Sequence, residues 1–425
     1  MASPSARTLR GRVTVRGVTT APARPRILVL NQYYWPGVEA TAQLLAQLCE
    51  ALAADYDVTV VTGHLRGHEL PDEEVRNGVR IVRVRSTTYD RSRLHHRAAN
   101  YGSYLGVTTL AALRGARPDL VLCMTDPPIV GDIGLIVARR FGAPLLVISQ
   151  DVFPEIAERV NRLENPVLVR ALRALVGVYL HNADRVVAIG DTMKLRLERK
   201  GARSGRIDVI PNWVDTKEIQ PQSRRNAWSA EHGLDDVFVV MHSGNIGHAQ
   251  DLDTLVRAAT FLRDLDRLRI MVIGFGARHG ELVRLAQRLE VTSAVRFMDY
   301  QPRERLSLSL ATGDLHYVGL ARGLSGFVVP SRLYGVLAAG RPVVVSADAD
   351  SEIVTIVEEA GCGLVVAPGR PDLVAGAIRD VVERRVSLDG MGERGRAWVE
   401  GEADREVAFD RYRRLVADVV ASSSR

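Results

Sequence analysis

The chain has 425 residues, of which 46% are hydrophobic and 25% are charged, a balance typical of globular proteins that excludes fibrous, collagenous and wholly disordered classes. This length exceeds one ordinary core and suits two α/β domains. The formal net charge of +6 favours partners that carry negative charge, such as phosphorylated substrates, nucleic acid or an anionic membrane face.

The amino-terminal segment is basic. Its first 26 residues contain six arginines, no Asp or Glu, and many Ser, Thr, Ala and Pro residues. This composition predicts a disordered tail over residues 1–25. The alternatives are a tether to anionic lipid or an organelle-type presequence.

The sequence also favours a cytoplasmic location. No apolar run follows the early arginines as in a secretory signal, and no stretch has the length of a membrane span. Cys49, Cys123 and Cys362 lie far apart in apolar contexts, which is typical of buried thiols in a reducing compartment. We therefore expect a cytoplasmic protein, with the inner face of the plasma membrane as the place of any membrane contact.

Short β-branched runs alternate with helix-length segments from residue 26 onward, which predicts parallel sheets covered on both faces. The candidate strands of the first half are Arg26–Asn31, Asp57–Thr62, Val79–Arg85, Asp119–Met124, Pro144–Ser149, Arg185–Ile189 and Ile207–Pro211. The alternation restarts with Val237–Ser243, Arg269–Gly274, Ala294–Asp299, Asp314–Gly319, Pro342–Ser346 and Gly363–Ala367. Two such blocks predict two Rossmann-like domains facing a central cleft, where ligands bind at the carboxyl ends of the strands.

The polar segment Asp215–Asp235 is the expected linker. It divides the chain into a first domain over residues 26–215 and a second domain over residues 216–403. A last helix, over residues 404–421, follows the second domain.

One loop of the first half is aromatic. It leaves the first strand and contains Tyr33, Tyr34, Trp35 and Gly37. These aromatic side chains could stack on a sugar or cover a lipid; the alternative is burial in the core. The later stretch Arg91–Tyr104 mixes basic residues with tyrosines, which fits an acceptor-facing or membrane-facing amphipathic helix or an ordinary solvated one.

Two carboxylates follow later strands of the first half. Asp126 lies in an Asp-Pro-Pro turn, and Asp151 directly follows the apolar run Pro144–Ser149. Asp151 should therefore point into the cleft. The alternative is that it caps the following turn.

The loop Ser243–Gln250 follows a strand and opens a helix in the second half. It contains Gly244, Asn245, Gly247 and Gln250. Glycine lets the backbone approach a phosphate closely, and a helix N-terminus offers free N–H donors and a positive potential. A tight turn without a ligand explains the glycines equally well.

A second glycine pair follows the strand Arg269–Gly274. Gly274, Phe275 and Gly276 could form a wall of a nucleotide pocket, with the Phe275 ring behind a base, or they could form only a tight turn. Glu352 lies between a strand and a helix. Its carboxylate could accept hydrogen bonds from ribose or sugar hydroxyls, or it could complement the helix dipole.

A third loop of the second half carries positive charge. It contains Arg322 and leads to a helix that begins with Ser331 and Arg332. Ser331 is a good N-cap residue, whereas Arg332 would oppose the helix dipole, which hints at function. An arginine fork at a helix N-terminus suits a diphosphate; the alternative is a solvated surface arginine.

These loops, in this order, resemble the family 4 retaining glycosyltransferases of exopolysaccharide and O-antigen assembly, such as the colanic acid enzymes. The matching stretches are Asn31–Gly37 with Ala40–Ala42, Asp126–Pro128, Asp151–Glu155, Val209–Asp215, Ser243–Gln250, Val272–Gly276 and Val329–Val343. The resemblance implies the GT-B fold, with the nucleotide-sugar donor in the second domain and the acceptor in the first. It also implies metal-independent chemistry in which the leaving diphosphate helps deprotonate the acceptor hydroxyl.

The chain departs from the family pattern at several positions. Asn245 and Gln250 stand where many members carry an Arg and a Lys that grip the diphosphate. Phe327 and Gly335 stand where many carry a pair of Glu residues, the second of which binds the donor ribose. We therefore expect the positive charge to come from residues elsewhere in this domain. The candidates are Arg322 and Arg332, assisted by the backbone donors of Gly244–Gly247, with Glu352 as the substitute carboxylate.

The catalytic histidine of some members also has no clear counterpart, which leaves Asp151 and Asp126 as the candidate catalytic residues. The resemblance predicts transfer of a hexose or deoxyhexose to a glycan or polyprenyl-diphosphate-linked acceptor in cell-surface polysaccharide synthesis, with no cofactor and no catalytic metal. A degenerate GT-B scaffold and a GT-B nucleotide-sugar epimerase are the alternatives. No motif supports nucleic-acid binding, because aromatic residues do not interleave with the basic tail.

Overall fold

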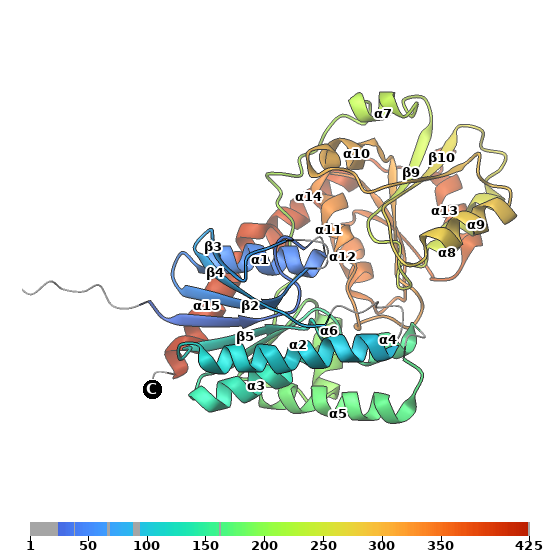
Figure 1. Ribbon diagram of the computed structural model, residues 1–425. Coiled ribbons are helices and arrows are strands. Elements are labelled where there is room, and N and C mark those ends of the chain that lie inside the picture. Colours follow the sequence, from blue (N-terminus) through green and yellow to red (C-terminus); the bar gives the residue numbers. More distant parts are fainter. Residues whose placement is uncertain (1–23, 38, 66–68, 88–93, 161–162, 424–425) are drawn as a thin grey trace, which may run out of the picture.

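The computed structural model describes residues 24–37, 39–65, 69–87, 94–160 and 163–423, and Figure 1 shows them as two α/β domains. All but the last two residues of the predicted tail over 1–25 lie outside these ranges, as do residues 91–93 of the basic stretch. Each domain is built on a largely parallel sheet, which confirms the predicted fold class. The boundary at residues 215 and 216 stays a prediction of the sequence.

The first sheet has eight strands in the order β3-β4-β2-β1-β5-β6-β7-β8. Its strands are β1 Arg26–Leu30, β2 Asp57–Gly63, β3 Glu73–Arg76, β4 Val79–Val84, β5 Leu120–Met124, β6 Leu145–Ser149, β7 Arg185–Ala188 and β8 Ile207–Val209. Its helices are α1 Ala40–Leu52, α2 Leu94–Arg114, α3 Val130–Phe141, α4 Glu155–Arg159, α5 Pro166–Asn182, α6 Asp191–Arg199 and the 3₁₀ turn η1 Ser204–Arg206. Every residue of the central strand β5 is buried, as expected for a strand with helices on both faces.

The second sheet has six parallel strands in the order β11-β10-β9-β12-β13-β14. Its strands are β9 Phe238–Ser243, β10 Leu268–Ile273, β11 Val295–Met298, β12 Leu315–Gly319, β13 Val343–Ser346 and β14 Gly363–Val366. Its helices are α7 Ala227–Glu231, α8 Leu252–Ala258, η2 Ala259–Phe261, α9 His279–Arg288, η3 Arg303–Arg305, α10 Leu306–Thr312, α11 Arg332–Ala338, α12 Glu352–Ala360, α13 Pro371–Val382 and α14 Met391–Glu402. The loops that carry the predicted site residues follow β9, β10, β12 and β13.

Two elements of the first domain were not predicted. Strand β3 pairs antiparallel with β4, although its sequence Glu-Glu-Val-Arg carries no apolar run. An ion pair of 2.7 Å between Arg80 Nη2 and Glu73 Oε2 lies across this pair, so cross-strand charge takes the place of hydrophobic burial. Helix α4, Glu155–Arg159, is only five residues long and was not among the expected helices.

The chain passes between the domains twice, and the two crossings lie side by side. Val214 and Asp404 form a parallel bridge. The Val214 N–H donates to the Ala403 carbonyl at 3.0 Å, and the Arg405 N–H donates to the Val214 carbonyl at 2.9 Å. An ion pair of 2.5 Å between Arg405 Nη1 and Asp215 Oδ2 closes the same joint.

The last helix, α15 Arg405–Ser423, packs against the first domain (Figure 1). The Trp213 ring meets Phe409 and Tyr412 edge-on, with ring centroids 5.5 and 5.8 Å apart. The Trp213 Nε1–H donates to Gln47 Oε1 at 2.8 Å. The Tyr412 ring is fully buried, and its hydroxyl has no hydrogen-bond partner in the described part of the chain.

We expect the two halves of the Tyr412 side chain to act in opposite directions on stability. Tyr412→Phe removes a buried, unsatisfied hydroxyl and should raise the free energy of unfolding by up to ~1 kcal/mol. Tyr412→Ala also removes the ring and should lower it by ~3–5 kcal/mol. Urea denaturation followed by tryptophan fluorescence measures both, and a destabilised Tyr412→Phe variant would contradict this account of the hydroxyl.

Candidate active site

Three loops of the second domain meet at the carboxyl ends of its strands. The loop after β9 contacts the loop after β10 through the Ile246 N–H, which donates to the Phe275 carbonyl at 3.0 Å. It contacts the loop after β12 through the Ala249 carbonyl, which accepts from the Ala321 N–H at 2.9 Å. The predicted loop residues therefore lie together at the sheet edge where ligands bind in such domains.

The glycines of these loops permit a close approach of one backbone to another. Gly274 has a φ of +133°, and a Cβ added to it would lie 1.9 Å from the Gly244 carbonyl oxygen. A Cβ added to Gly276 would lie 2.4 Å from the Ile246 carbonyl oxygen. Only glycine fits at Gly274 and Gly276, so loop packing is sufficient to explain both residues.

The amides of Gly244, Ile246 and Gly247 in the β9 loop already have acceptors. The Gly244 N–H donates to the Ile273 carbonyl at 2.9 Å, and the Gly247 N–H donates to Gln250 Oε1 at 2.9 Å. The Ile246 N–H is also used, as described above. This corrects the expectation that the amides of Gly244–Gly247 stand free for a phosphate, and it gives Gln250 the role of closing the loop. Asn245 is exposed.

Arg332 brings an unneutralised positive charge to this place. It is the first residue of α11, and its Nη2 donates to the Gly319 carbonyl at 3.0 Å. Its Nε is buried without a hydrogen-bond partner, and none of the ion pairs in the described residues includes it. A Cβ added at Gly244 would lie 3.9 Å from the Arg332 side chain, so the guanidinium stem borders the β9 loop.

Burial lowers the pKa of Arg332 to about 10, so the side chain stays cationic at neutral pH. A desolvated cation without a counter-charge is unfavourable unless a ligand supplies one. Ser331 occupies the N-cap position, as predicted, but its side chain makes no capping hydrogen bond.

Sequence reasoning missed two residues beside Arg332. His242, at the end of β9, is fully buried, and burial together with the Arg332 charge holds its pKa well below the usual range. Tyr300 follows β11, and its hydroxyl donates to the Phe275 carbonyl at 3.4 Å. The position of Tyr300 after a strand was the signal that could have found it.

Phe275 and Tyr300 give this edge an exposed aromatic surface. Phe275 is 59% exposed and Tyr300 is 56% exposed. The Phe275 ring stacks on His279 at a centroid distance of 5.3 Å. The exposed Phe275 ring is accessible to a ligand in this arrangement. Its predicted role behind a base stays a prediction.

Arg322 and Glu352 already have hydrogen-bond partners within the protein. Arg322 is exposed, and its Nη2 donates to the Pro368 carbonyl at 3.1 Å. Glu352 Oε2 accepts hydrogen bonds from the N–H and the Oγ1 of Thr192 in the first domain, both at 3.3 Å. In this structure the Glu352 carboxylate therefore joins the two domains and does not stand free for a ribose.

The two predicted carboxylates of the first domain do come together. Burial raises the pKa of Asp151 to about 7, and the nearby charge of Asp126 adds to this shift. Asp126 Oδ2 accepts a hydrogen bond from Thr41 Oγ1 at 2.9 Å. Asp151 also lies at the domain interface, where its backbone forms an antiparallel bridge with Val328 of the second domain. The catalytic role of the pair stays a prediction.

The aromatic loop after β1 does not form an open platform. Tyr33 is 8% exposed and Tyr34 is 2% exposed. Trp35 is covered by Arg76, whose Cζ lies 4.2 Å from the ring centroid. Gly37 completes a turn by donating to the Tyr34 carbonyl at 2.8 Å. These positions correct the prediction of Tyr33 and Tyr34 as sugar-stacking residues, because their rings are used in packing.

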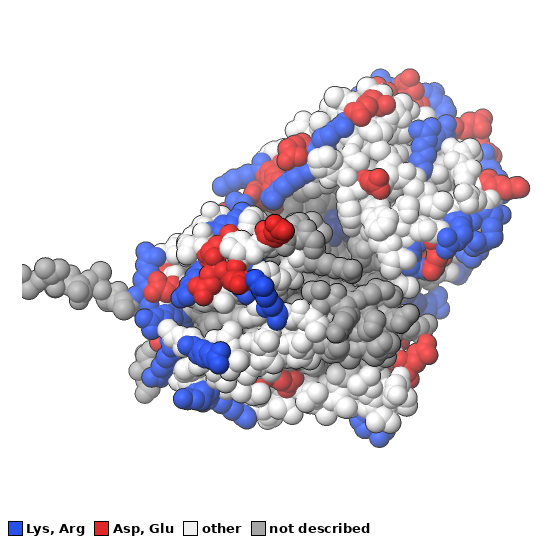
Figure 2. Space-filling view, viewed as in Figure 1, with Lys and Arg blue, Asp and Glu red and all other residues white. Residues whose placement is uncertain are grey.

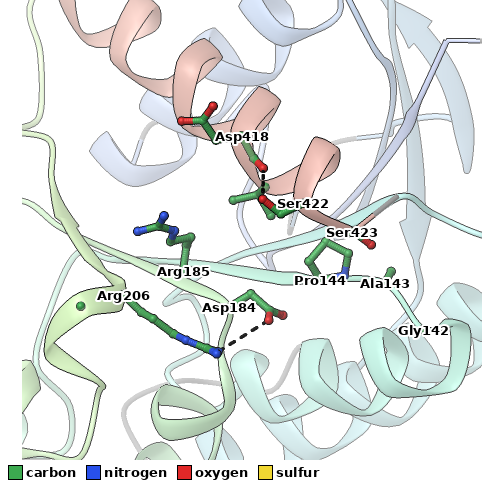
Figure 3. Close-up of a pocket in the computed structure, with 11 residues that line it drawn as sticks. Gly142, Ala143, Pro144, Asp184, Arg185, Arg206, Asp418, Ser422 and Ser423 are labelled. Carbon is green, nitrogen blue, oxygen red and sulfur yellow. Dashed lines mark hydrogen bonds and ion pairs between the residues drawn. The ribbon is translucent and has the colours of Figure 1, made fainter. Parts of the chain in front are cut away.

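The surface is hollowed between the two domains and also at a separate pocket of the first domain. Figure 2 shows the surface hollowed between the two domains. A pocket of about 520 Å³ lies elsewhere, between the amino ends of β6 to β8 and the end of α15 (Figure 3). It is lined by Asp184, Arg185, Arg206, Asp418 and Ser422, and the 3.6 Å ion pair of Arg206 with Asp184 crosses it. Its place at the opposite strand ends separates it from the candidate site.

The described residues contain neither a metal-binding cluster nor a membrane-spanning helix. No group of three or more His, Cys, Asp or Glu side chains in the described ranges could hold a metal ion. None of the helices built from the described residues is long and apolar enough to cross a membrane.

Comparison with known families places glycosyl transfer on both domains. Residues 37–213 match the family described as "Glycosyl transferase 4-like domain". Residues 224–398 match the family described as "Glycosyl transferases group 1".

Two relatives are named for the same activity. WbjE of Pseudomonas aeruginosa, named as a probable glycosyltransferase, is 24% identical over 73% of this chain and 77% of its own length. WcaI of Escherichia coli strain K12, named for colanic acid biosynthesis as a glycosyl transferase, is 29% identical over 48% of this chain and 50% of its own length.

Solved structures share the fold. Sucrose-phosphate synthase from Thermosynechococcus elongatus has a TM-score of 0.74 at 18% identity, covering 94% of this chain and 100% of its own. Anabaena HepE in complex with UDP-glucose has a TM-score of 0.71 at 15% identity, covering 92% of this chain and 99% of its own.

The raised pKa of Asp151 predicts a pH effect on stability. Between its unfolded pKa of ~3.9 and its folded pKa of about 7, the folded chain holds a proton that the unfolded chain has lost. This stabilisation is complete below about pH 4 and is lost as the pH rises through about 7. We expect Asp151→Asn to lack this loss, and Asp126→Asn to lower the pKa of Asp151. Carbon NMR titration of the carboxyl groups measures the pKa of Asp151 in each protein. A wild-type Asp151 that titrates at ~4 would contradict its raised pKa.

Proposed function

Because this chain belongs to family 4 of the GT-B glycosyltransferases, we propose that it transfers a hexose or deoxyhexose from a nucleotide-diphosphate sugar to a glycan or polyprenyl-diphosphate-linked acceptor. The anomeric configuration is retained, and the product serves cell-surface polysaccharide synthesis. The name of WcaI, which refers to colanic acid biosynthesis, supports this choice of pathway, and the name of WbjE supports glycosyl transfer. The UDP-glucose complex of HepE supports the class of donor.

The observation that carries the proposal is the unpaired guanidinium of Arg332. It lies beside the Gly244 turn, near the exposed rings of Phe275 and Tyr300. A diphosphate between these groups would supply the missing counter-charge, and the rings would flank the base. The same cation would stabilise the charge that develops on the leaving diphosphate, so we expect no requirement for a divalent metal or a cofactor.

Asp151 and Asp126 take the acceptor side of the reaction in this proposal. The bond from the anomeric carbon to the diphosphate breaks, the acceptor oxygen bonds to the same face of that carbon, and the acceptor proton passes to the leaving phosphate. With a pKa of about 7, the Asp151 carboxyl both donates and accepts hydrogen bonds at neutral pH, which suits orientation of an acceptor hydroxyl.

Arg332→Ala tests the donor site. Loss of charge-assisted hydrogen bonds of ~1.5–3 kcal/mol should weaken binding of the preferred nucleotide sugar by roughly 10–150-fold in calorimetric titration. Arg288→Ala is the control, because Arg288 is exposed on α9 of the same domain. Unchanged affinity in Arg332→Ala would remove Arg332 from the site.

Titration of the wild type with a panel of UDP-, GDP- and dTDP-sugars also identifies the base. A folded wild type that binds none of these sugars would favour the scaffold alternative. Isomerised donor in the absence of any acceptor would favour the epimerase.

The membrane part of the proposal rests on helix α5. Its face away from the sheet carries Val167, Leu175 and Val178, which are 74%, 46% and 49% exposed. Their spacing forms one apolar stripe at helical period, and Ala171 lies within it. The neighbouring helix α3 adds Ile136, which is 52% exposed.

The charged residues around the apolar stripe of α5 indicate what kind of surface it would contact. Helices α2, α3 and α5 lie along the same side of the first domain (Figure 1), and their only acidic residue, Asp132, is half-buried. Arg139, Arg140 and Arg170 are exposed there. Glu158, which pairs with Arg173 of α5 at 3.2 Å, and Glu164 are exposed at the amino end of α5. Beyond that end, an apolar stripe with basic neighbours fits an anionic bilayer, which would hold a polyprenyl-linked acceptor.

Vesicle sedimentation tests this contact. The double variant Val167→Asp with Leu175→Asp should lose most of its binding to vesicles of phosphatidylcholine and phosphatidylglycerol, because it places two carboxylates in the apolar stripe. Leu373→Asp, at an exposed leucine of α13 in the other domain, should bind as the wild type does. Equal binding of all three proteins, or dimers in light scattering that only the double variant loses, would contradict the membrane assignment.

A further inference from the structure

The loop between β12 and α11 reaches from the second domain onto the first. Its residues Gly323–Val328, here called the crossing segment, pair with the chain that follows β6. The Val152 N–H donates to the Phe327 carbonyl at 2.9 Å, and Val328 forms the antiparallel bridge with Asp151. The segment that borders the candidate catalytic carboxylate is therefore part of the donor domain.

Two arginines of the first domain enclose the Phe327 ring. The Cζ of Arg159 lies 4.4 Å from the ring centroid and that of Arg196 lies 4.7 Å from it. Phe327 is only 5% exposed. A guanidinium at this distance is attracted by the ring quadrupole, and more strongly where water is excluded.

The same two guanidiniums also hold the backbone of the crossing segment. Arg159 Nη1 donates to the Gly323 carbonyl at 2.8 Å, and Arg196 Nε donates to the Ser325 carbonyl at 3.3 Å. Each arginine therefore uses its charge on a carbonyl and on the Phe327 ring. The only acidic partner that the described ion pairs give either of them is Asp350, at 4.0 Å from Arg196.

The crossing segment is fixed to its own domain as well. The Gly323 N–H donates to Asp348 Oδ2 at 2.6 Å, and Ser325 Oγ donates to the Asp350 carbonyl at 2.9 Å. Gly326 has a φ of +74°, and a Cβ added to it would lie 2.7 Å from the Thr192 carbonyl oxygen. A larger residue would push the segment away from α6 of the first domain.

We propose that Phe327 is a positioning residue, which, held between Arg159 and Arg196, sets the placement of Asp151 relative to Arg332. The inference rests on the proposed transfer reaction. Val328 contacts Asp151, and four residues later the same loop begins α11 with Arg332. A shift of this loop moves the diphosphate cation relative to the acceptor carboxylates, which lowers the rate of transfer more than the affinity for the nucleotide.

Phe327→Leu and Phe327→Tyr separate positioning from packing. Leucine keeps apolar bulk and removes the ring, so kcat should fall about tenfold or more, as expected when two cation–π contacts of ~0.5–2 kcal/mol are lost. Tyrosine restores the ring and should restore kcat to within about threefold, and nucleotide Kd should change by less than about twofold in both variants. An unchanged kcat in Phe327→Leu, or equal losses with leucine and tyrosine, would overturn the proposal.

Arg196→Met should reproduce the fall in kcat, whereas Arg199→Met should not, because Arg199 is exposed on the same helix. Equal effects of the two methionine variants would count against a role for the ring contact.

Distance measurement decides the point without activity. Spin labels on Ala171→Cys in α5 and Arg288→Cys in α9 would report the domain separation, because both sites are exposed and Cys49, Cys123 and Cys362 are buried. We expect one narrow distance distribution in the labelled parent and in Phe327→Tyr, and a broad one in Phe327→Leu. A narrow distribution in Phe327→Leu would overturn the positioning role, whereas a wild type that binds no nucleotide sugar would overturn the proposed function alone.

Discussion

A half-buried arginine with no carboxylate partner among the described residues is the constraint on which the second domain depends. Arg332 begins a helix, where the dipole disfavours a cation, and its Nε has no hydrogen-bond partner among the described residues. The loop after β9 presses against its stem because Gly244 and Gly274 have no side chains. A protein gains no stability from such an arrangement, so the arrangement is best understood as a site that an anion completes.

In contrast to the Arg332 cation of the second domain, the first domain carries a pair of carboxyl groups. Asp126 and Asp151 follow neighbouring strands, and burial, together with the charge of Asp126, raises the pKa of Asp151. The crossing segment contacts Asp151 of the first domain through Val328, and the same loop leads to Arg332 four residues later. A shift of this segment against α6 and the chain after β6 would therefore change the distance between the two groups.

The fold was predictable because buried parallel strands appear in the sequence as continuous apolar runs, as in β5 and β6. The topology of a parallel sheet then places the loops after these strands at one edge. Asp126 and Asp151 were found in this way. The sequence could not show which acceptor each amide of the β9 loop finds, nor that Tyr34 turns into the core. Glu352 was misjudged for a related reason, since its partner Thr192 lies 160 positions away in the chain. Contacts between distant segments depend on domain packing, which local patterns do not encode.

The paired crossings at Val214 and Asp404 limit how this molecule can open. A single connecting strand permits rotation about several axes, but two strands hydrogen-bonded to each other resist twisting and sliding, so bending remains the easy motion. The two domains would then open by a hinge motion about this joint. If the domains open by bending at this joint, the gap is widest at the side away from it, and a tether across that side would trap product even with every reacting group intact.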